Sequence, residues 1–419
     1  MTIDFYKNSV CLNISKLFIA MTLLLVISSC SEDKPTDKSK ITLKIGALLP
    51  LTGSGSSAGE SMLAALEVAT EAIKNSEENE VEIELHTLDT ETSPQKALAQ
   101  LETFKSMGIS FVVGPYSSAE LDFIRSYADD NDILLISPSS GSISLAIADD
   151  NVIRLTTNDF HQADAISKYF DKIKLSKVCA VIRDDVWGNS LYDAVNEAGK
   201  STGFEFNSQI KYSTSIQDYT QIVGEVENKV TELVNSSNDV SEVAVYMATF
   251  NEGTDILAAS SGKEFSEKVS WIGTSAYALN STLLADDAAF DFAVKTNLIC
   301  PVYQPDDAYQ NVLAPVESQI KAKIGRVPES YAYTTFDSFI VAASSANAVR
   351  LNPGLSPKEA AMLFCSTNTG ITGALELDEY GDRKDGVYNF WQVRKTNNVN
   401  EWYVSYKYNT KTGLLEEVQ

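Results

Sequence analysis

Basic residues are scarce in this chain. Lysine and arginine number 33 against 57 aspartates and glutamates, which gives a net charge of −24 at pH 7 over 419 residues. Binding to nucleic-acid phosphates depends on a surplus of positive charge, so this balance argues against a DNA- or RNA-binding protein. It also disfavours docking on an anionic lipid surface through a basic patch. The acidic surface indicates solubility and no particular partner.

Histidine and cysteine are scarce as well. The two histidines are too few for a histidine-based metal cluster. Beyond residue 30 the cysteines are Cys179, Cys300 and Cys365, whose odd number and wide spacing predict neither a disulfide framework nor a zinc site. Cys179 lies in an apolar run where a buried, inert thiol is expected, and pairing of Cys300 with Cys365 stays open. We therefore predict no metal and no cofactor.

Long apolar runs are absent except near the N-terminus. Residues 17–27 are mostly apolar but too few to cross a bilayer, which takes about 20 residues. Lysines precede this run and Ile-Ser-Ser follows it, ending at Cys30, so the pattern resembles a bacterial lipobox. Residues 1–29 are thus predicted to be a lipoprotein signal peptide, Cys30 the lipidated residue and residues 30–40 a solvated tether. The alternative is a weak signal peptide that happens to contain a cysteine.

From residue 41 onward, short β-branched runs alternate with segments of helical period. This alternation predicts an α/β fold with parallel sheets, and the length predicts two lobes. The strands expected in the first block are 43–49, 81–88, 110–113 and 133–136, with helices at 59–74, 94–107 and 118–131. The second block has expected strands at 177–182, 204–210, 242–246 and 269–273, with helices at 161–172, 190–201, 218–234 and 252–261. Two helices, 308–324 and 334–349, then precede a tail of short strands at 373–377, 387–394 and 402–408.

The loop of residues 50–60 has three interpretations. Gly53-x-Gly55-x-x-Ala58 matches a dinucleotide-binding fingerprint, but the nearest acidic residue, Asp89, lies too far along the chain. The stretch from Gly55 to Gly59 matches the nucleophile elbow of serine hydrolases, which needs a downstream histidine that the chain barely offers. The third interpretation is a flexible rim that closes over a ligand.

Two hydroxyl-rich loops give a stronger signal. Residues 113–118 end in serines that open a helix, where free backbone N–H groups favour an anion; the alternative is ordinary N-capping of that helix. Residues 136–142 follow the next expected strand, so both loops face one crevice at the carboxyl ends of adjacent strands. Asp159, at the start of the second block, could bind a ligand ammonium or serve only as a helix cap.

In order and content these segments resemble the leucine/isoleucine/valine-binding family, the type I periplasmic binding proteins of ABC importers. The resemblance rests on residues 44–53, 112–118, 136–138, 154–159, 181–188, 370–373 and 378–382. It implies two doubly wound lobes joined by three crossovers, near Asn158, near 298–301 and near 370–373. The N-terminal lobe would comprise 41–158 plus 300–372, and the C-terminal lobe 159–299 plus 373–419.

The resemblance also implies a ligand site. Ser118 and the loop of Ser139, Ser140 and Gly141 would hold the α-carboxylate of an amino acid, and Asp159 its ammonium. The family commonly has threonine where this chain has Gly141, so Ser140 or Ser142 would have to serve.

On the second lobe, Trp187 and Phe250 occupy the positions of aromatic residues at the mouth of the site. In the amino-acid binders of this family, a second acidic residue helps to hold the ammonium. In this chain that acidic residue is replaced near Ser275, with Tyr277 close by. Its loss leaves other amino acids, small amides and aromatic acids open as ligands.

The sequence therefore predicts a monomeric, lipid-anchored, extracytoplasmic solute-binding protein that hands a small ligand to an ABC permease. A ligand-sensing receptor module of the same fold is the first alternative. An NAD-dependent enzyme or a serine hydrolase is the second, and the export signal and the scarcity of histidine weigh against it.

Overall fold

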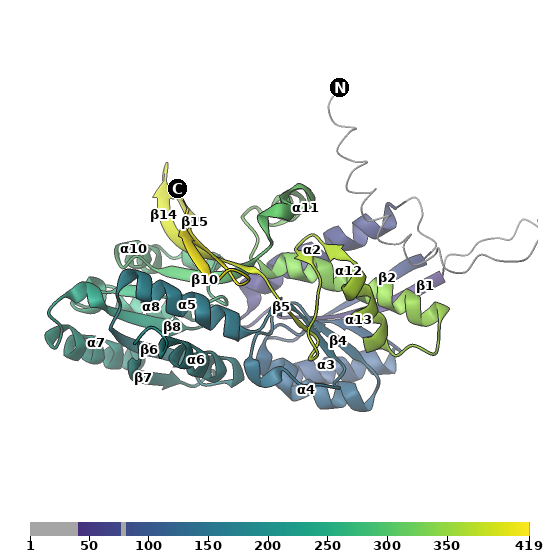
Figure 1. Cartoon of the computed structure of the whole chain (residues 1–419), viewed down its shortest axis with the longest axis horizontal. Coiled ribbons are helices and arrows are strands. Elements are labelled where there is room, and N and C mark those ends of the chain that lie inside the picture. The colour runs from purple at the N-terminus through teal and green to yellow at the C-terminus, as the bar shows by residue number, and fades with distance from the viewer. Residues whose placement is uncertain (1–40, 77–80, 419) are drawn as a thin grey trace, which may run out of the picture.

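The computed structural model describes residues 41–76 and 81–418, which form two α/β lobes lying side by side (Figure 1). The predicted signal peptide, Cys30 and the tether lie outside the described residues. Within the described part of the chain, none of the helices is long and apolar enough to cross a membrane. Cys179, Cys300 and Cys365 are all buried free thiols, so the open Cys300–Cys365 pairing is not formed.

The first lobe is built on a sheet of short apolar strands. They are β1 (Ile41–Leu49), β2 (Val81–Asp89), β3 (Phe111–Val113), β4 (Leu134–Ser137), β5 (Val152–Thr157) and β13 (Asp382–Arg383). The order β13-β5-β4-β3-β1-β2, with parallel pairing throughout, is that of a doubly wound sheet.

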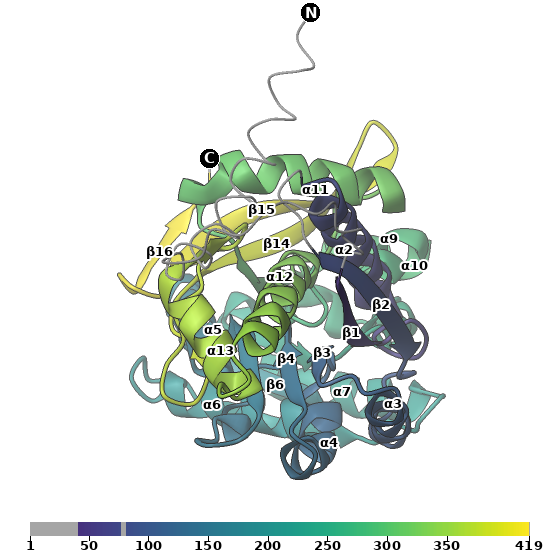
Figure 2. The ribbon, with the colours of Figure 1, turned by 90° about the vertical axis from the view of Figure 1, so that its right-hand side faces the viewer.

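Helices surround this first sheet, some packing on its two faces and others on those helices. They are α2 (Ser56–Lys74), α3 (Pro94–Ser106), α4 (Ser118–Asp130), α11 (Gln310–Ile324), α12 (Tyr331–Leu351) and α13 (Pro357–Thr367). Figure 2 shows α2 and α12 on one side of the strands and α3 and α4 on the other. Successive side chains of β1 point to opposite faces of the sheet, so one strand serves both layers of helices. Ile45 and Ala47 join the core with α2, whereas Leu48 joins the core with α3 and α4.

The second lobe repeats the plan with an antiparallel extension. Its strands are β6 (Lys177–Arg183), β7 (Phe206–Tyr212), β8 (Val243–Ala248), β9 (Ser270–Ile272), β10 (Ile299–Gln304), β14 (Val387–Thr396), β15 (Val399–Asn409) and β16 (Leu414–Glu417). Their order is β16-β15-β14-β10-β9-β8-β6-β7, in which β6 to β10 pair in parallel and β14 to β16 antiparallel. Its helices are α5 (Asp159–Ile173), α6 (Val186–Gly199), α7 (Thr220–Asn235), α8 (Gly253–Ser260), α9 (Ser281–Ala285) and α10 (Asp287–Lys295).

The predicted fold class, two doubly wound lobes with three crossovers, is confirmed. The first crossover lies where expected, because β5 ends at Thr157 and α5 begins at Asp159. The other two lie later than expected. Residues 299–304 form β10, which pairs with β9 and β14, so the chain leaves the second lobe only after Gln304. Similarly, β13 pairs with β5 in the first sheet, and the third crossover falls at 384–386.

Each shift has a physical reason. The apolar run 299–304 completes the hydrogen bonding of β9, which would otherwise be an edge strand. β13 has only two residues, which is too short for a periodic pattern, and a small hairpin of β11 (Thr369–Gly370) and β12 (Gly373–Ala374) precedes it. The expected boundaries at residues 300 and 373 are therefore corrected to about 305 and 384.

Candidate functional site

The predicted binding residues all follow the carboxyl ends of strands that meet at the gap between the lobes. In the first sheet, β3 leads to Ser118 and β4 to the serine loop, residues 137–142; β5 ends just before Asp159. In the second sheet, β6 leads to Trp187, β8 to Phe250 and β9 to Ser275. This is the edge at which doubly wound sheets bind ligands, because every parallel strand ends there.

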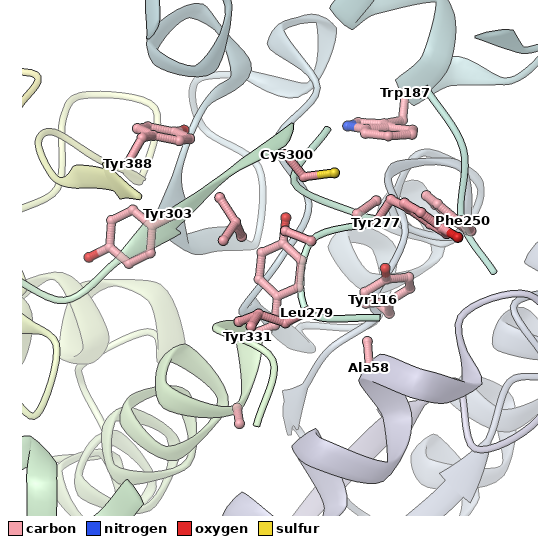
Figure 3. Packing of buried hydrophobic residues seen from close by; sticks show 14 of the residues in the cluster. Ala58, Tyr116, Trp187, Phe250, Tyr277, Leu279, Cys300, Tyr303, Tyr331 and Tyr388 are labelled. Atoms are coloured by element: carbon pink, nitrogen blue, oxygen red, sulfur yellow. The ribbon is translucent and has the colours of Figure 1, made fainter. Parts of the chain in front are cut away.

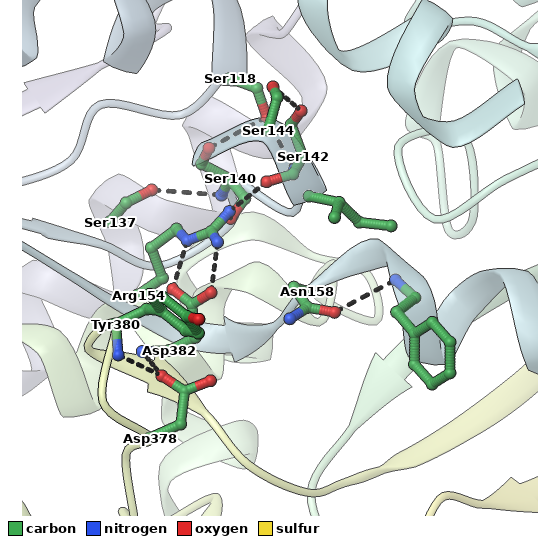
Figure 4. A network of polar contacts seen from close by, with 12 residues as sticks. Ser118, Ser137, Ser140, Ser142, Ser144, Arg154, Asn158, Asp378, Tyr380 and Asp382 are labelled. Atoms are coloured by element: carbon green, nitrogen blue, oxygen red, sulfur yellow. Dashed lines mark hydrogen bonds and ion pairs between the residues drawn. The ribbon is translucent and has the colours of Figure 1, made fainter. Parts of the chain in front are cut away.

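Ser118 and the serine loop form a compact hydroxyl cluster (Figure 4). The hydroxyl oxygens of Ser118 and Ser140 lie 2.9 Å apart. Ser118 also accepts a hydrogen bond of 3.3 Å from the backbone N–H of Ser142. The Ser142 hydroxyl instead faces Ser144, at 2.9 Å. Of the two hydroxyls expected to compensate for Gly141, that of Ser140 is therefore the one beside Ser118.

Arg154, buried in β5, fixes the shape of this loop from below. Its guanidinium donates to the backbone oxygens of Ser142 and Ser140, at 2.7 and 3.3 Å. It also forms a bidentate ion pair with Asp382 of β13, and the Nε–Oδ1 distance is 2.5 Å. With these carbonyls held, the loop presents the hydroxyl of Ser140 to Ser118. Sequence analysis placed Arg154 in a family motif but did not recognise this positioning role.

Asp159 meets the serine loop from the other side. Its backbone N–H donates to the oxygen of Gly141 at 2.7 Å, and a Cβ added to Gly141 would lie 2.5 Å from its Oδ1. Oδ1 accepts a hydrogen bond of 2.8 Å from Gln162, whose own side-chain oxygen accepts from the N–H of Ser275 at 2.8 Å. Gln162, which sequence analysis missed, thus ties Asp159 to Ser275.

The carboxylate of Asp159 is buried and only partly hydrogen-bonded. The residue is only 3% exposed, and its Oδ2 has no hydrogen-bond partner among the described residues. Burial raises its pKa to about 7, although the hydrogen bond from Gln162 and the nearby charge of Arg154 act in the opposite direction. A buried oxygen without a partner is a position that a cationic donor would complete.

Aromatic rings from both lobes come together beside the serines of the site (Figure 3). Tyr116 and Tyr331 come from the first lobe, Trp187 and Phe250 from the second. The ring centroid of Phe250 lies 5.4 Å from that of Tyr116 and 5.2 Å from that of Trp187, while Tyr116 and Tyr331 are 6.0 Å apart. Sequence analysis missed Tyr331, which lies far from the other three rings along the chain.

The cavity beneath these rings is small. It has a volume of about 10 Å³, and its lining consists of Tyr116, Ser117, Ser118, Ser139, Trp187, Phe250, Ala276 and Tyr331. That is room for roughly one water molecule. A ligand of amino-acid size therefore requires the two lobes to move apart, as a hinge at the three crossovers allows.

The side chain of Arg183 packs against the ring of Phe250. The guanidinium lies 3.7 Å from the centroid of the ring, within the range of a cation–π contact. Arg183 in turn forms ion pairs with Asp185 at 2.6 Å and with Glu252 at 2.5 Å. The aromatic wall of the second lobe therefore rests on a fixed charged support.

The glycine-rich loop lies at the rim between the lobes. The N–H of Gly55 donates to Thr92 Oγ1 at 2.9 Å. Asn251 of the second lobe donates its backbone N–H to the oxygen of Ser54 and its side-chain amide to Ser56 Oγ, both at 3.0 Å. These bonds fit the interpretation of the loop as a rim that closes.

Ser57, the residue at the nucleophile position of the elbow motif, also bridges the lobes. Its hydroxyl donates to Glu329, accepts from the N–H of Ser281 at 2.9 Å and lies 2.9 Å from the Ser281 hydroxyl. Its partners are a carboxyl and a serine, and neither is the histidine that a hydrolase would use. Within residues 41–76 and 81–418, no three His, Cys, Asp or Glu side chains are grouped as a metal site.

Comparisons with known proteins identify the family and the fold. Residues 61–396 match the family described as "receptor family ligand binding region". An uncharacterized protein of Methanocaldococcus jannaschii is 25% identical over 400 residues, covering 88% of this chain and 92% of its own length.

Solved structures share the fold at low sequence identity. A leucine-binding protein from Thermotoga maritima superimposes with a TM-score of 0.69 and 17% identity, covering 86% of this chain and 97% of that one. A solute-binding protein of an ABC transporter from R. palustris, in complex with benzoate, has a TM-score of 0.69 and 16% identity, covering 87% and 96% of the two chains. The fold is that of the type I periplasmic binding proteins, and the chain belongs to the receptor ligand-binding-region family.

Proposed function

We propose that this protein traps a small solute bearing a carboxylate, most simply an amino acid or a related amide, between its two lobes. One observation carries the proposal. Oδ2 of Asp159 is buried without a partner among the described residues, beside the paired hydroxyls of Ser118 and Ser140. The site thus holds an acceptor for a cation next to donors for an anion, which is the pattern of an amino-acid zwitterion.

Each wall of the site has a role in this proposal. The hydroxyl of Ser118, at the N-terminus of α4, and those of Ser139 and Ser140 in the serine loop bind the ligand carboxylate. Asp159 binds the ammonium through a charge-assisted hydrogen bond, with Gln162 fixing its orientation. The rings described above cover the rest of the ligand and exclude water when the lobes close. Nothing in this arrangement activates a nucleophile, so the protein binds and releases its solute unchanged.

The wider setting follows from the N-terminal sequence and from the similar proteins. The predicted signal peptide and the predicted lipidation of Cys30 support a location outside the cytoplasm, anchored to a bacterial membrane. We infer that the protein acts there as a monomer. The R. palustris protein is named as a solute-binding protein of an ABC transporter. We therefore infer that this chain delivers its solute to an ABC permease in the same membrane system.

Ligand binding is tested most directly by native mass spectrometry of the purified protein, followed by calorimetric titration with amino acids, amides and benzoate. We expect at least one carboxylate-bearing solute to bind at micromolar concentration or tighter. Asp159→Ala should abolish binding of amine-bearing ligands, whereas Asp193→Ala, an exposed carboxylate on α6, should not change it. Failure of every solute to bind, or full affinity in Asp159→Ala, would overturn the proposal.

Anchoring is tested separately. Labelling of bacteria with a radioactive fatty acid should mark the wild-type protein, and Cys30→Ser should remove the label. An unlabelled wild-type chain would contradict the lipid anchor without affecting the proposed ligand site.

A further inference from the structure

A second, much larger cavity lies next to the small cavity beneath the aromatic rings, here called the closed site. It has a volume of about 920 Å³ and lies between the lobes, with Thr92 and Ser117 on one side and Arg183, Tyr219 and Asp255 on the other. Ser117 lines both cavities. Phe250 of the closed site is followed directly by Asn251 and Glu252 of the cleft. This volume lies within the range of pockets that bind a whole small molecule, about 300–1,000 Å³.

The charge of this cleft is strongly negative. Its lining contains the carboxylates of Glu91, Asp185, Glu252, Asp255 and Asp286 and a single cation, Arg183. Five negative charges and one positive charge leave a net charge of −4. Arg183 is already paired with two of the acids, so it offers little attraction to an anion. Lys96 lies outside the lining and pairs with Glu91 at 3.1 Å, which still leaves a clear negative excess.

Glu252 supplies an independent sign that this cleft is incomplete. Its side chain is 8% exposed, and its Oε1 accepts from Arg183, from the hydroxyl of Tyr212 at 2.8 Å and from the N–H of Phe250 at 3.2 Å. Its Oε2 has no partner among the described residues. Glu252 lines the cavity, and its buried Oε2 is a position for a donor from a ligand that enters when the lobes open.

Asp255 shows the same crowding of negative charge. Partial burial raises its pKa, and the nearby carboxylates of Asp286 and Glu252 raise it further. A cation placed among these three groups would relieve their mutual repulsion.

We propose that this cleft receives the cationic end of an extended ligand whose carboxylate end is held at Ser118 and Ser140. The inference rests on the proposed function and names its ligand class: a basic amino acid or a short basic peptide carrying an ammonium or guanidinium group at its far end. Ser117 lines both cavities and Phe250 is followed directly by residues of the cleft, so the two cavities are adjacent and one molecule would reach both once the lobes open. The surplus of carboxylates distinguishes such a ligand from leucine or benzoate, which carry no charge at that end.

Matched ligand pairs provide the test. Lysine and norleucine differ only in the terminal ammonium, and arginine and citrulline form a near-isosteric charged and neutral pair. Calorimetric titration of the full-length protein should show lysine or arginine binding at least tenfold more tightly than its neutral counterpart. Dipeptides with alanine first and one of these four residues second test whether the ligand is a short peptide. The preference should weaken as salt is raised, because part of the cleft is exposed to solvent.

Two substitutions locate the effect. The double variant Asp255→Asn with Asp286→Asn should reduce the charged-ligand preference to less than threefold and leave norleucine affinity unchanged. The amide introduced by Asp286→Asn retains a side-chain oxygen for the N–H of Ala289, so α10 keeps its cap. The control is Asp291→Asn, an exposed carboxylate on α10 outside the cleft, which should preserve the preference.

The outcomes separate the two proposals. Equal binding of lysine and norleucine, and of the other pairs, would overturn the inference while the proposed function stands. A preference that survives in the double variant would likewise overturn it, since the cation would then lie elsewhere. If no member of any pair binds and no other solute does, the proposed function fails and this inference fails with it.

Discussion

Replacing Asp159 by asparagine should make the empty protein more stable and the ligand site weaker. The side chain is 3% exposed, and burial raises its pKa from the ordinary 3.8 to about 7. A rise of roughly three pH units costs the folded state about 4 kcal/mol when the carboxylate is ionised, at about 1.4 kcal/mol per unit. The amide that replaces the carboxylate would carry no charge and would keep an oxygen for Gln162.

The sign of the pH dependence follows from linkage. Because the folded pKa of Asp159 lies above the unfolded value, the folded protein holds a proton that the unfolded chain has lost between pH 4 and 7. Stability from this group is therefore greatest near pH 4 and declines as pH rises toward 7. Asp159→Asn should exceed the wild type in free energy of unfolding by up to about 4 kcal/mol at pH 8 and by almost nothing at pH 4.

The assay is thermal and urea unfolding of both proteins from pH 4 to 8, with the exposed Asp193→Asn as control. Comparison at each pH cancels the contribution of Glu329, whose pKa burial also raises to about 7. Ligand affinity should change oppositely, because loss of a buried charge partner costs about 2–5 kcal/mol in binding. A variant no more stable than wild type at pH 8, or one that still binds amine ligands fully, would refute the reasoning.

Three further changes probe other contacts. Gly141→Ala should weaken ligand binding by roughly 1–3 kcal/mol in calorimetry, because its Cβ would lie 2.5 Å from Asp159 Oδ1; undiminished affinity would show that the loop yields freely. Arg154→Met should destabilise the fold by about 3–5 kcal/mol in urea unfolding, because Asp382 is left buried and unpaired, and adding Asp382→Asn should recover part of that loss. Ser57→Ala removes contacts between the lobes worth about 1 kcal/mol each. It should enlarge the radius of gyration measured by X-ray scattering without ligand, and an unchanged radius would rule out this contact as a latch.

Local patterns were sufficient to predict most strands and helices. The runs at 43–49 and 177–182 became β1 and β6 almost unchanged, because buried parallel strands are continuously apolar. The serine loops and Asp159 could be placed near one another because all parallel strands end at the same edge. β5 was not recognised as a strand, because its sequence is interrupted by Arg154 and ends in threonines.

Contacts between distant segments could not be predicted in this way. Arg183 meets Phe250 because β6 pairs with β8 in the second sheet, and Tyr331 meets Tyr116 because α12 packs near β3 in the first lobe. The packing of segments that are distant in sequence therefore decides both contacts. β13 contributes Asp382 from a strand of two residues, below the length at which any period is visible. The later positions of the second and third crossovers have the same origin, since strand pairing and not composition decides them.

The ion pair between Arg154 and Asp382 also sets an order of assembly. The two residues are 228 positions apart, and the carbonyls of the serine loop depend on the first of them. Arg154 therefore lacks the carboxylate that fixes it under the loop until almost the whole chain is available. For a protein exported N-terminus first, as proposed, this delays completion of the binding site until translocation is nearly finished. The unfolded chain then remains threadable, and the trap forms only in the compartment where its solute is found.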